Sequence, residues 1–365
     1  FAVRTGDAEK KSRYVEALLQ EMELAGDWTG AFDTIYFGGG TPSSLEPVDL
    51  ERVVERARER FSFGEDPWIF LEANPEDVTP DACAAWRALG VRTLSLGVQS
   101  LSDEALRFLG RRHDAQQARA AVEIAQAAGF DTVSVDLIFG LPGQTPEAWR
   151  RELTTAATTL EPGHLSCYQL TIHARTRFGV AERRGQLSEM PEGEQAVLFR
   201  LAHRVLADAG YSAYEVSNFA RGRDHESRHN RKYWDHTPYL GLGPSAHSLA
   251  FESGRGQVSA RRWWNERRTP RWERRVAAGE PPIEGEESLD AEALATEAVM
   301  LGLRTAAGID LDGFAASYGV DLVTANEALV SHLVDEGRLV MGDGPGGSRW
   351  LTPTASGLAV ADGLA

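Results

Sequence analysis

The first two thirds of the chain alternate between segments of helical and of strand-like hydrophobic period. Tyr14, Leu18 and Met22 recur at helical spacing within residues 11–24, which predicts a helix with one apolar face. Residues 33–37, Asp-Thr-Ile-Tyr-Phe, lead into three glycines, which predicts a strand followed by a tight turn. The same alternation predicts further strands at residues 68–72, 92–97, 132–138 and 165–170, and further helices that begin near residues 50, 80, 115 and 146.

Two of the expected helices carry explicit start signals. Thr79-Pro80 and Thr145-Pro146 each place a hydroxyl before a proline. A threonine hydroxyl caps free backbone N–H groups, and proline fits the first helical position because its missing N–H is not needed there. We therefore expect both threonines to be N-caps.

Strand, loop and helix repeat about every 30 residues, which predicts parallel strands joined by right-handed crossovers. Most of the expected strands end in a polar or glycine-rich motif, and the carboxyl ends of the strands carry the functional groups of β/α barrels. A doubly wound open sheet is the competing architecture. Such a sheet would gather its glycines at one nucleotide turn, whereas here they are spread over successive strands. The pattern favours an α/β fold of the barrel type.

Composition changes after about residue 210, and we divide the chain there. Residues 211–285 form an extension that is rich in aromatic, basic and histidine residues. Within it, residues 261–275 carry seven arginines and three tryptophans. Residues 280–287, which cross the end of the extension, are acidic with two prolines, which predicts a linker. Residues 286–365 show two helical patterns, two short strands and a closing helix, which predicts a small winged-helix-like α+β domain. The barrel then occupies residues 1–210.

Charge and hydropathy narrow the classes of function. The net charge is −16 over 365 residues, and an acidic chain repels phosphate backbones, so we expect no nucleic-acid partner. No run approaches the ~20 apolar residues of a transmembrane segment, and no secretory signal pattern is present. A cytoplasmic location without a membrane span is the expectation.

The two cysteines exclude two kinds of site. Cys83 and Cys167 are too few for a disulfide framework or for a four-cysteine metal site made by this chain alone. Cys83 has helical spacing with Trp86, and Cys167 lies in a strand-like run. We expect both to be buried, where a free cysteine behaves as a small hydrophobic residue.

Five motifs in order along the chain carry a family resemblance. They are Tyr-Phe-Gly-Gly-Gly-Thr-Pro-Ser at 36–43, Glu-Ala-Asn-Pro at 72–75, Leu-Gly-Val-Gln-Ser at 96–100, Asp-Leu-Ile-Phe-Gly-Leu-Pro-Gly-Gln-Thr at 136–145 and Gly-Leu-Gly-Pro-Ser-Ala-His at 241–247. One glycine turn alone would be a weak signal, but this set resembles the coproporphyrinogen-oxidase-like radical S-adenosylmethionine (SAM) family over nearly the whole chain. The resemblance implies a (β/α)6 radical-SAM barrel, and it implies SAM as a cofactor.

The resemblance also assigns residues to SAM. It places Gly39, Gly40 and Thr41 at the methionine end and Glu72 at the ribose hydroxyls. It adds Gln99, Arg111, Asp136 and His247 as further SAM-contacting positions. Alternatives remain at this stage: Glu72 and Asp136 could be capping or surface carboxylates, and Arg111 or the adjacent Arg112 could be a solvated helix residue.

The chain departs from the family at one essential motif. In the family a Cys-x3-Cys-x2-Cys loop follows the first barrel strand, and its three thiolates hold a [4Fe–4S] cluster with one iron open to SAM. This chain has no such loop, so we expect no metal ligands in it. Phe1 falls where a phenylalanine follows the last cysteine of the family. The hypothesis is that the first strand and the cluster cysteines lie upstream of Phe1, which would make the barrel partial.

A second motif resembles the haem-chaperone branch of the family. His229, Asn230, Tyr233 and Trp234 form a His-Asn-x-x-Tyr-Trp pattern. Histidine is a common axial ligand of haem iron, so the resemblance makes His229 the candidate ligand, with the other three residues around the haem. In the alternative, the motif only builds the floor of the barrel mouth. Three nearby positions qualify the assignment: His225 and His236 are alternative ligands, and Ser227 stands where this branch often has cysteine.

The resemblance leaves three functions open. The first is a haem chaperone that binds haem and SAM, and a [4Fe–4S] cluster in the full-length protein, and that passes haem to a membrane-bound acceptor. The second is an oxygen-independent coproporphyrinogen III oxidase, in which a SAM-derived radical removes two propionate carboxyl groups. The third is a remnant that binds only a nucleotide.

The arginine-rich segment at residues 261–275 has two interpretations. Its arginines could bind porphyrin propionates, although an amphipathic helix with solvated arginines is the simpler interpretation.

Overall fold

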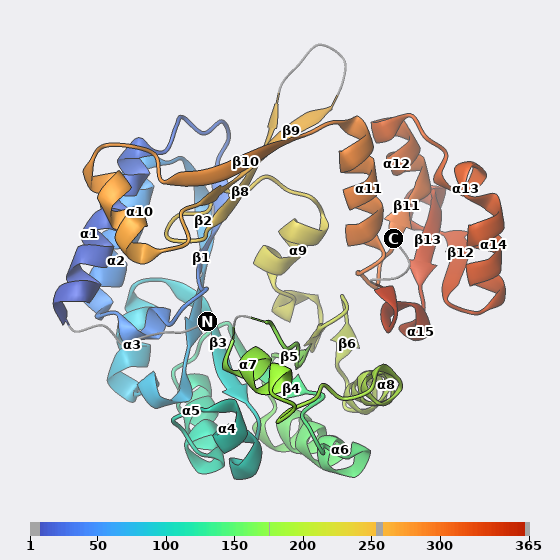
Figure 1. The fold of residues 1–365 in the computed structure, drawn as a ribbon, viewed down its shortest axis with the longest axis horizontal. Helices are drawn as coiled ribbons and strands as arrows, with labels where there is room; N and C mark the ends of the chain where they lie inside the picture. Colours follow the sequence, from blue (N-terminus) through green and yellow to red (C-terminus); the bar gives the residue numbers. More distant parts are fainter. Residues whose placement is uncertain (1–7, 175, 253–257, 362–365) are drawn as a thin grey trace. The chain divides into compact units, whose positions relative to one another are not determined.

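The computed structural model describes residues 8–174, 176–252 and 258–361 (Figure 1). These residues divide into two compact units, which we describe separately. The first unit comprises Thr34–Pro47 and Trp68–Glu226, and the second comprises residues 8–33, Val48–Pro67 and residues 227–361. The three-part division expected from composition stays a prediction. None of the helices in the described ranges combines the length and the apolarity that crossing a membrane requires.

A seven-stranded sheet follows the chain order over its first five strands. Strands β2 to β5 run parallel to one another. From β1 to β5 the order has no reversal, which excludes the doubly wound sheet and confirms the barrel-type fold. At one end of the order, β1 has β2 as its only neighbour among the described strands. The strands are β1 (Phe32–Phe37), β2 (Phe63–Ala73), β3 (Val91–Gln99), β4 (Thr132–Phe139), β5 (His164–Gln169), β7 (Asn218–Ala220) and β6 (Ser212–Ala213).

The last two strands of this sheet were not expected from the sequence. Strand β7 pairs antiparallel with β5, and β6 pairs antiparallel with β7. Both are only two or three residues long, which is too short to show the alternation of hydrophobic and polar residues that identifies a strand. Their pairing therefore depends on the neighbouring strand rather than on a local pattern.

Helices of the first unit connect its strands, and their starts follow the expected caps. They are α3 (Pro80–Ala88), α4 (Asp103–Leu109), α5 (Ala115–Ala127), α6 (Pro146–Thr155), α7 (Arg177–Arg183) and α8 (Glu192–Asp208). The Thr79 hydroxyl accepts a hydrogen bond from the Ala82 amide, and the Thr145 hydroxyl accepts one from the Ala148 amide, so both predicted N-caps are confirmed.

Both cysteines are buried, as expected. Cys83 lies in α3 and Cys167 in β5, and neither forms a disulfide. Burial raises the pKa of the Cys83 thiol to about 11 and also raises the pKa of Cys167. Both side chains are therefore neutral thiols that fill the core, to which fully buried tryptophans such as Trp86 and Trp149 also belong.

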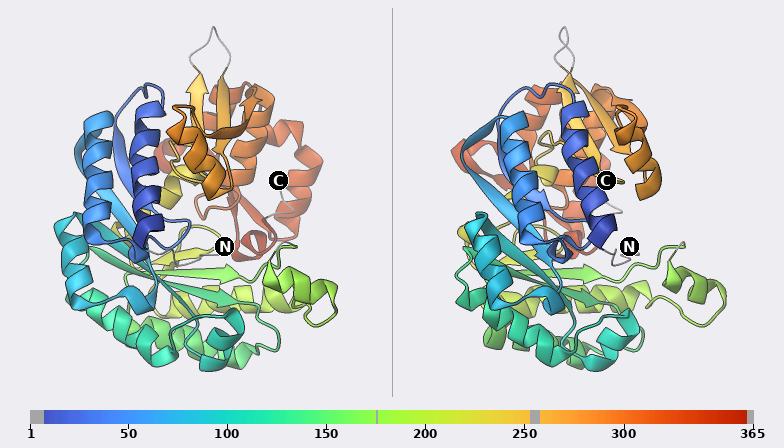
Figure 2. Two further views of the ribbon diagram at one scale, coloured as in Figure 1. Left: turned by 60° about the vertical axis from the view of Figure 1, so that its left-hand side comes forward. Right: turned by 90° about the vertical axis from the view of Figure 1, so that its left-hand side faces the viewer.

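Two helices of the second unit, α1 (Ala8–Leu24) and α2 (Pro47–Arg60), lie side by side (Figure 2). Ion pairs join them: Arg52 lies 2.6 Å from Glu16, and Arg56 lies 3.0 Å from Glu23. On the buried face of α1, the Tyr14 ring packs against Trp272 of α10 (Thr269–Ala277) with ring centroids 5.4 Å apart. The predicted apolar face of the first helix is thus used to hold α10.

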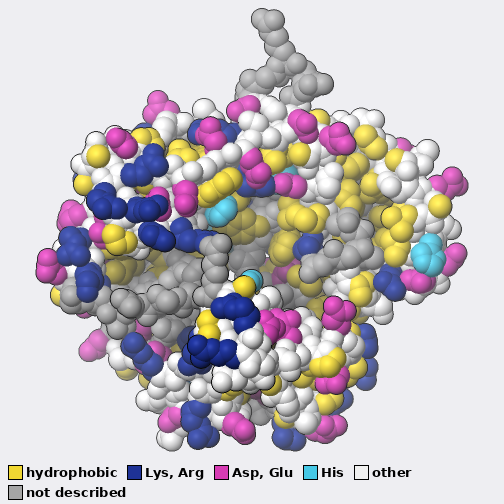
Figure 3. Space-filling model, viewed as in Figure 1, with side chains coloured by type: hydrophobic (Ala, Val, Ile, Leu, Met, Phe, Trp, Pro, Cys, Tyr) yellow, Lys and Arg dark blue, Asp and Glu magenta, His cyan; other side chains and the backbone are white. Residues whose placement is uncertain are grey.

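Residues 261–289 differ from the expectation. An antiparallel sheet in the order β10-β9-β8 contains β9 (Ser259–Asn265), β10 (Ile283–Leu289) and β8 (His247–Glu252). Most of the acidic segment expected to be a linker is therefore strand β10. Only the second part of the arginine-rich segment is helical, as α10, on the face where basic side chains gather in Figure 3.

The reason for this difference lies in cross-strand charge pairing. Arg261 of β9 stands 2.5 Å from Glu286 of β10, and Arg262 stands 2.9 Å from Glu287. Opposite charges on neighbouring strands stabilise a sheet. Taken separately, the acidic segment predicts a linker and the basic segment predicts a helix. In the structure, most of the acidic segment pairs as a strand with the first part of the basic segment.

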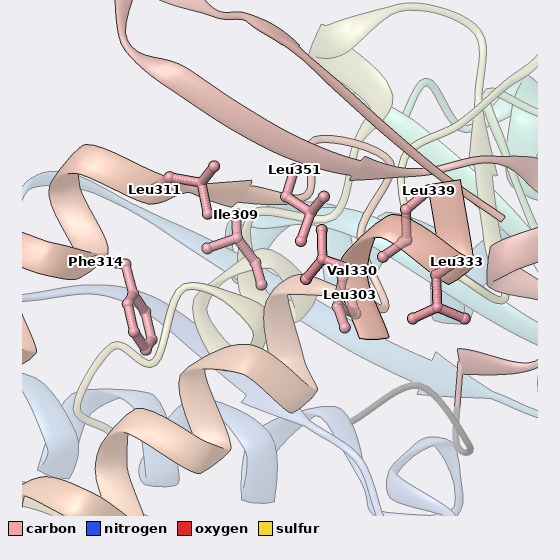
Figure 4. Close-up of a cluster of buried hydrophobic side chains, with 8 residues drawn as sticks. All are labelled: Leu303, Ile309, Leu311, Phe314, Val330, Leu333, Leu339 and Leu351. Carbon is pink, nitrogen blue, oxygen red and sulfur yellow. The ribbon is translucent and has the colours of Figure 1, made fainter. Parts of the chain in front are cut away.

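The C-terminal part of the second unit is the expected small α+β domain. Its sheet has the antiparallel order β11 (Ile309–Asp310), β13 (Arg349–Pro353), β12 (Leu339–Asp343). Figure 4 shows its apolar core, in which Phe314, Leu333 and Leu351 take part. Four helices precede β12, where the sequence indicated two. The helices are α11 (Ala291–Gly302), α12 (Leu311–Tyr318), α13 (Leu322–Ala325), α14 (Glu327–Asp335) and the closing α15 (Ala355–Leu358).

Candidate functional site

The glycine turn that follows β1 has a backbone that requires glycine. Gly39 has φ +83°, a left-handed conformation that side chains disfavour. A Cβ on Gly38 would overlap the Tyr36 ring and lie 2.8 Å from Oε1 of Glu72. At Gly39 and Gly40 the corresponding space is open. The turn therefore packs against Glu72 on one side and leaves its backbone accessible on the other.

Glu72, near the end of β2, points at this turn. Its Oε1 accepts a hydrogen bond from the Tyr36 hydroxyl at 2.5 Å, and its Oε2 accepts one from the Gly39 amide at 3.1 Å. Burial raises the pKa of the Glu72 carboxyl, and the two hydrogen bonds lower it in part. The carboxylate is thus fixed in orientation beside the glycine turn.

A second contact fixes the segment after the glycines. The Ser43 hydroxyl donates to Asp77 at 2.6 Å and accepts a hydrogen bond from the Asn74 amide at 3.2 Å. Thr41 immediately precedes the short helix Pro42–Ser44 and makes no side-chain cap bond to it. The loops after β1 and β2 are therefore tied together just behind Gly39, Gly40 and Thr41.

Asp136 lies on β4, where three serines surround its carboxylate. The Ser95 hydroxyl is 3.2 and 3.3 Å from the two carboxylate oxygens, and Ser166 and Ser134 also hydrogen bond to it. Burial raises the pKa of Asp136 to about 7, the negative charge of Glu72 contributes in the same direction, and the serines oppose it. The negative charge of Glu72 is therefore close enough to affect the protonation of Asp136.

The side chains of Gln99 and Arg111 both lie close to the backbone of Gly97. A Cβ on Gly97 would lie 2.8 Å from Nε2 of Gln99 and 3.3 Å from Nη2 of Arg111. Arg111 donates to Oδ1 of Asn74 at 2.6 Å and to the Gly97 carbonyl at 3.1 Å. Gln99 has φ +67°, and strained backbone of this kind is concentrated at functional sites. Arg111 faces inward, whereas Arg112 is exposed.

The structure adds residues that sequence reasoning missed. Tyr36 binds Glu72, and Asn74 binds Arg111. Both lie inside the motifs that carried the family resemblance, so their positions were visible, but their partners are distant in sequence. The serines around Asp136 come from three strands, and no local pattern connects them.

His247 lies in the second unit, unlike the other seven SAM candidates. It begins β8, is exposed, and stacks on Trp264 with ring centroids 5.9 Å apart. The loop before it is anchored through Gly243, whose amide donates to Oε2 of Glu21 at 2.7 Å. The two units are described separately, so the role of His247 toward SAM stays a prediction.

Helix α9 (Arg228–Trp234) carries the four haem candidates in the second unit. His229 and Tyr233 stand one turn apart, with the Tyr233 hydroxyl 3.1 Å from Nε2 of His229. Ser227 caps the helix by accepting from the Asn230 amide at 3.2 Å, which gives serine a physical role at the position where the branch often has cysteine. The indole N–H of Trp234 is buried and has no hydrogen-bond acceptor within the described ranges.

Protonation favours His229 as a ligand. Burial, assisted by the positive charge of Lys232, lowers the pKa of His229 to about 4, while Asp33 acts in the opposite direction. The imidazole is therefore neutral near pH 7, which is the form that binds metals. The alternative ligands are already engaged, since His225 contacts Thr132 at 2.9 Å and His236 contacts Glu297 at 3.0 Å.

The described residues do not fit an iron–sulfur cluster. No group of three His, Cys, Asp or Glu side chains in residues 8–174, 176–252 and 258–361 could hold a metal ion. Cys83 and Cys167 are separately buried. Phe1, which marks the predicted position of the upstream cluster loop, lies outside the described residues.

The packing of Gly38 gives a first prediction. We expect Gly38→Ala to weaken SAM binding about ten-fold, because displacing the Tyr36 ring and the Glu72 carboxylate costs ~1–3 kcal/mol. Isothermal titration with SAM measures this. Gly193→Ala is the matched control, since nothing lies within 4 Å of its added Cβ. Equal affinities for the two variants would contradict the prediction.

Comparison with known proteins identifies the relatives of this chain. The profile of the Radical SAM superfamily matches residues 3–155, and that of the HemN C-terminal domain matches residues 289–344. The heme chaperone HemW of Mycobacterium tuberculosis H37Rv is 35% identical over 90% of this chain and 84% of its own length. HemW of Bacillus subtilis is 32% identical over 89% of this chain and 84% of its own length. The solved structure of coproporphyrinogen III oxidase HemN from Escherichia coli has a TM-score of 0.78 at 23% identity, covering 98% of this chain and 82% of that one.

Proposed function

Because this chain belongs to the HemW family of the radical SAM superfamily, we propose that it is a haem chaperone, which binds haem through His229 and passes it to an acceptor protein. The observation that carries the proposal is the placement of His229. It stands on α9, the helix that also carries Tyr233 and Trp234, and its Nε2 lies 3.1 Å from the Tyr233 hydroxyl. A neutral imidazole is a standard axial ligand of haem iron, and flat aromatic side chains can cover a porphyrin face.

The surroundings of His229 support haem further. Tyr233 is 40% exposed, and its ring packs edge-on against His229 and Tyr239. The indole N–H of Trp234 has no hydrogen-bond acceptor among the residues that the structure describes, and after a small rearrangement it can donate to a propionate. An aromatic surface with one neutral histidine and one free donor matches the chemistry of a porphyrin that carries iron and carboxylates.

The proposal gives the first unit the role of binding SAM. Glu72 would accept the ribose hydroxyls, the accessible backbone of Gly39, Gly40 and Thr41 would meet the methionine end, and Gln99, Arg111 and Asp136 would complete the site. The fixed carboxylate and the open space at Gly39 and Gly40 fit such a ligand. In radical SAM enzymes SAM supplies a 5′-deoxyadenosyl radical when an iron–sulfur cluster is bound. Here Tyr36 and the Gly39 amide orient Glu72 for the nucleotide.

A haemin titration tests the role of His229. We expect His229→Ala to lose the Soret shift of the histidine-bound haem and to bind haemin about ten-fold more weakly or worse, since the iron loses its protein ligand. His332→Ala, at an exposed histidine of α14, is the control and should behave as the wild type. Identical Soret spectra for wild type and His229→Ala would remove His229 from its proposed role.

The fold shared with coproporphyrinogen III oxidase keeps oxidative decarboxylation as a second candidate. A turnover assay on the full-length protein, with coproporphyrinogen III, SAM and a reductant, separates the two. Formation of the decarboxylated product would support the oxidase. Haem binding without turnover would support the chaperone.

A further inference from the structure

We infer that the Tyr233 hydroxyl competes with haem iron for Nε2 of His229, and that this competition keeps haem exchangeable. The inference rests on the proposed role of His229 as the iron ligand. It assigns to Tyr233 a regulatory function at the same site, in addition to the aromatic contact expected from the motif.

The contact between the two side chains is built into α9. Residues four positions apart lie on the same face of a helix, and here the Tyr233 hydroxyl is 3.1 Å from Nε2 of His229. Their rings meet edge to face, with centroids 5.0 Å apart and an interplanar angle of 87°. The hydroxyl therefore occupies the direction from which iron would approach that nitrogen.

Both tautomers of the imidazole lead to the same conclusion. If Nε2 carries no proton, its lone pair accepts the hydrogen bond from the phenol. If Nε2 carries the proton, it donates to the phenol oxygen and has no lone pair to give to iron. In either case the iron must break the contact between Tyr233 and His229 before it can bind Nε2.

The strength of this contact allows exchange. A single hydrogen bond between a phenol and an imidazole is modest in strength, so a metal bond can replace it.

Tyr233 is held in this position by its neighbours. Its ring packs against Tyr239 at 4.9 Å and 75°. Tyr239 is fixed in turn, because its backbone pairs with Leu249 at 2.9 and 3.0 Å and its hydroxyl hydrogen bonds to Arg262. Glu297 of α11 holds Arg262 at 2.8 and 2.5 Å. The phenol is thus ready to return to His229 when iron leaves.

Competition by the Tyr233 hydroxyl is consistent with the proposed role in haem delivery. A protein that delivers haem has to release it, and stabilising the haem-free histidine lowers the affinity without removing the ligand. Tyr233 is partly exposed, so an incoming porphyrin can reach it and displace its hydroxyl. The sequence motif would then encode both a ligand and the group that limits its affinity.

Removing only the hydroxyl tests the inference. Tyr233→Phe keeps the ring and its packing, and we expect it to bind haemin about five-fold more tightly, as follows from losing one competing hydrogen bond of ordinary strength. Transfer of haem to apomyoglobin should slow by a similar factor. Tyr318→Phe, which removes a phenol hydroxyl from α12 of the same unit, is the control and should leave both measurements unchanged.

A second readout reports the contact itself. In the haem-free protein, the imidazole ¹⁵N chemical shifts of His229 should move in Tyr233→Phe and stay in place in Tyr318→Phe. Unchanged or weaker haem binding in the folded variant would overturn the inference.

The outcomes separate the inference from the proposed function. If His229→Ala binds haemin as the wild type does, the proposed iron ligand is wrong, whatever Tyr233→Phe shows. If His229→Ala loses the haem and Tyr233→Phe binds with unchanged affinity, the ligand stands and only the competition by Tyr233 fails.

Discussion

Replacing Glu21 by alanine should lower the free energy of unfolding by about 3–5 kcal/mol, because three buried donors would lose their common acceptor. Glu21 lies on α1 and is 3% exposed. Its carboxylate accepts from the Gly243 amide at 2.7 Å, from Nε1 of Trp272 at 3.0 Å and from Nδ2 of Asn265 at 2.5 Å. Urea denaturation of the variant and the wild type measures the difference.

Glu23→Ala is the matched control on the same helix. The Glu23 side chain is 51% exposed and pairs with Arg56 at 3.0 Å. Exposed ion pairs contribute little, so we expect a loss of less than about 1 kcal/mol. Similar losses for Glu21→Ala and Glu23→Ala would show that the buried carboxylate does not organise the three donors.

The contribution of Glu21 to the free energy of unfolding should also depend on pH, because its carboxyl group titrates. Burial raises the pKa of Glu21 to about 7, above its ordinary value of 4.5. Between these two values the folded chain keeps a proton that the unfolded chain loses, so the contribution of Glu21 to stability falls as pH rises from about 4.5 to 7. The total change is on the order of 3 kcal/mol. Glu21→Gln should flatten the stability profile in this range, and a profile that keeps the wild-type slope would contradict the assignment.

Glu72→Gln should weaken SAM binding by about ten- to a hundred-fold, because hydrogen bonds from ribose hydroxyls to a charged carboxylate contribute ~1.5–3 kcal/mol. The change keeps the size of the side chain. It also turns one acceptor into an N–H₂ group that faces either the Tyr36 hydroxyl or the Gly39 amide, both of which donate to the native carboxylate. The orientation of the side chain is therefore lost together with its charge.

Isothermal titration with SAM measures the affinity of this variant. Glu46→Gln, at an exposed position of the same unit, is the control and should bind as the wild type does. An affinity of Glu72→Gln within two-fold of the wild type would remove Glu72 from the ribose site. Circular dichroism of both variants shows whether the folded structure is retained.

Sequence reasoning located most elements of the barrel and part of the candidate site. The strand and helix periods, the caps at Thr79 and Thr145, and the burial of both cysteines depend on residues a few positions apart, and the structure confirms them. The resemblance assigned Gly39 and Glu72 to the same ligand, and the structure brings them together after two neighbouring strands. These features are local, or they follow from the order of parallel strands.

Contacts between distant segments could not be predicted in the same way. The pairing of Arg261 with Glu286 makes strands of the first part of a supposed helix and of most of a supposed linker. The hydrogen bond between Tyr36 and Glu72 joins residues 36 positions apart. In both cases each segment alone has several acceptable conformations, and the partner selects one.

The amino-acid sequence by itself determined the class of fold, the order of the motifs and the identity of His229 as a candidate ligand, because periodicity and motif spacing are properties of the chain. Only the tertiary structure decided which donors meet the carboxylate of Glu21, which hydroxyls surround Asp136 and which phenol covers Nε2 of His229. The physical reason is that burial and hydrogen-bond partnership depend on the positions of atoms brought together by folding, and these in turn set the protonation of each group.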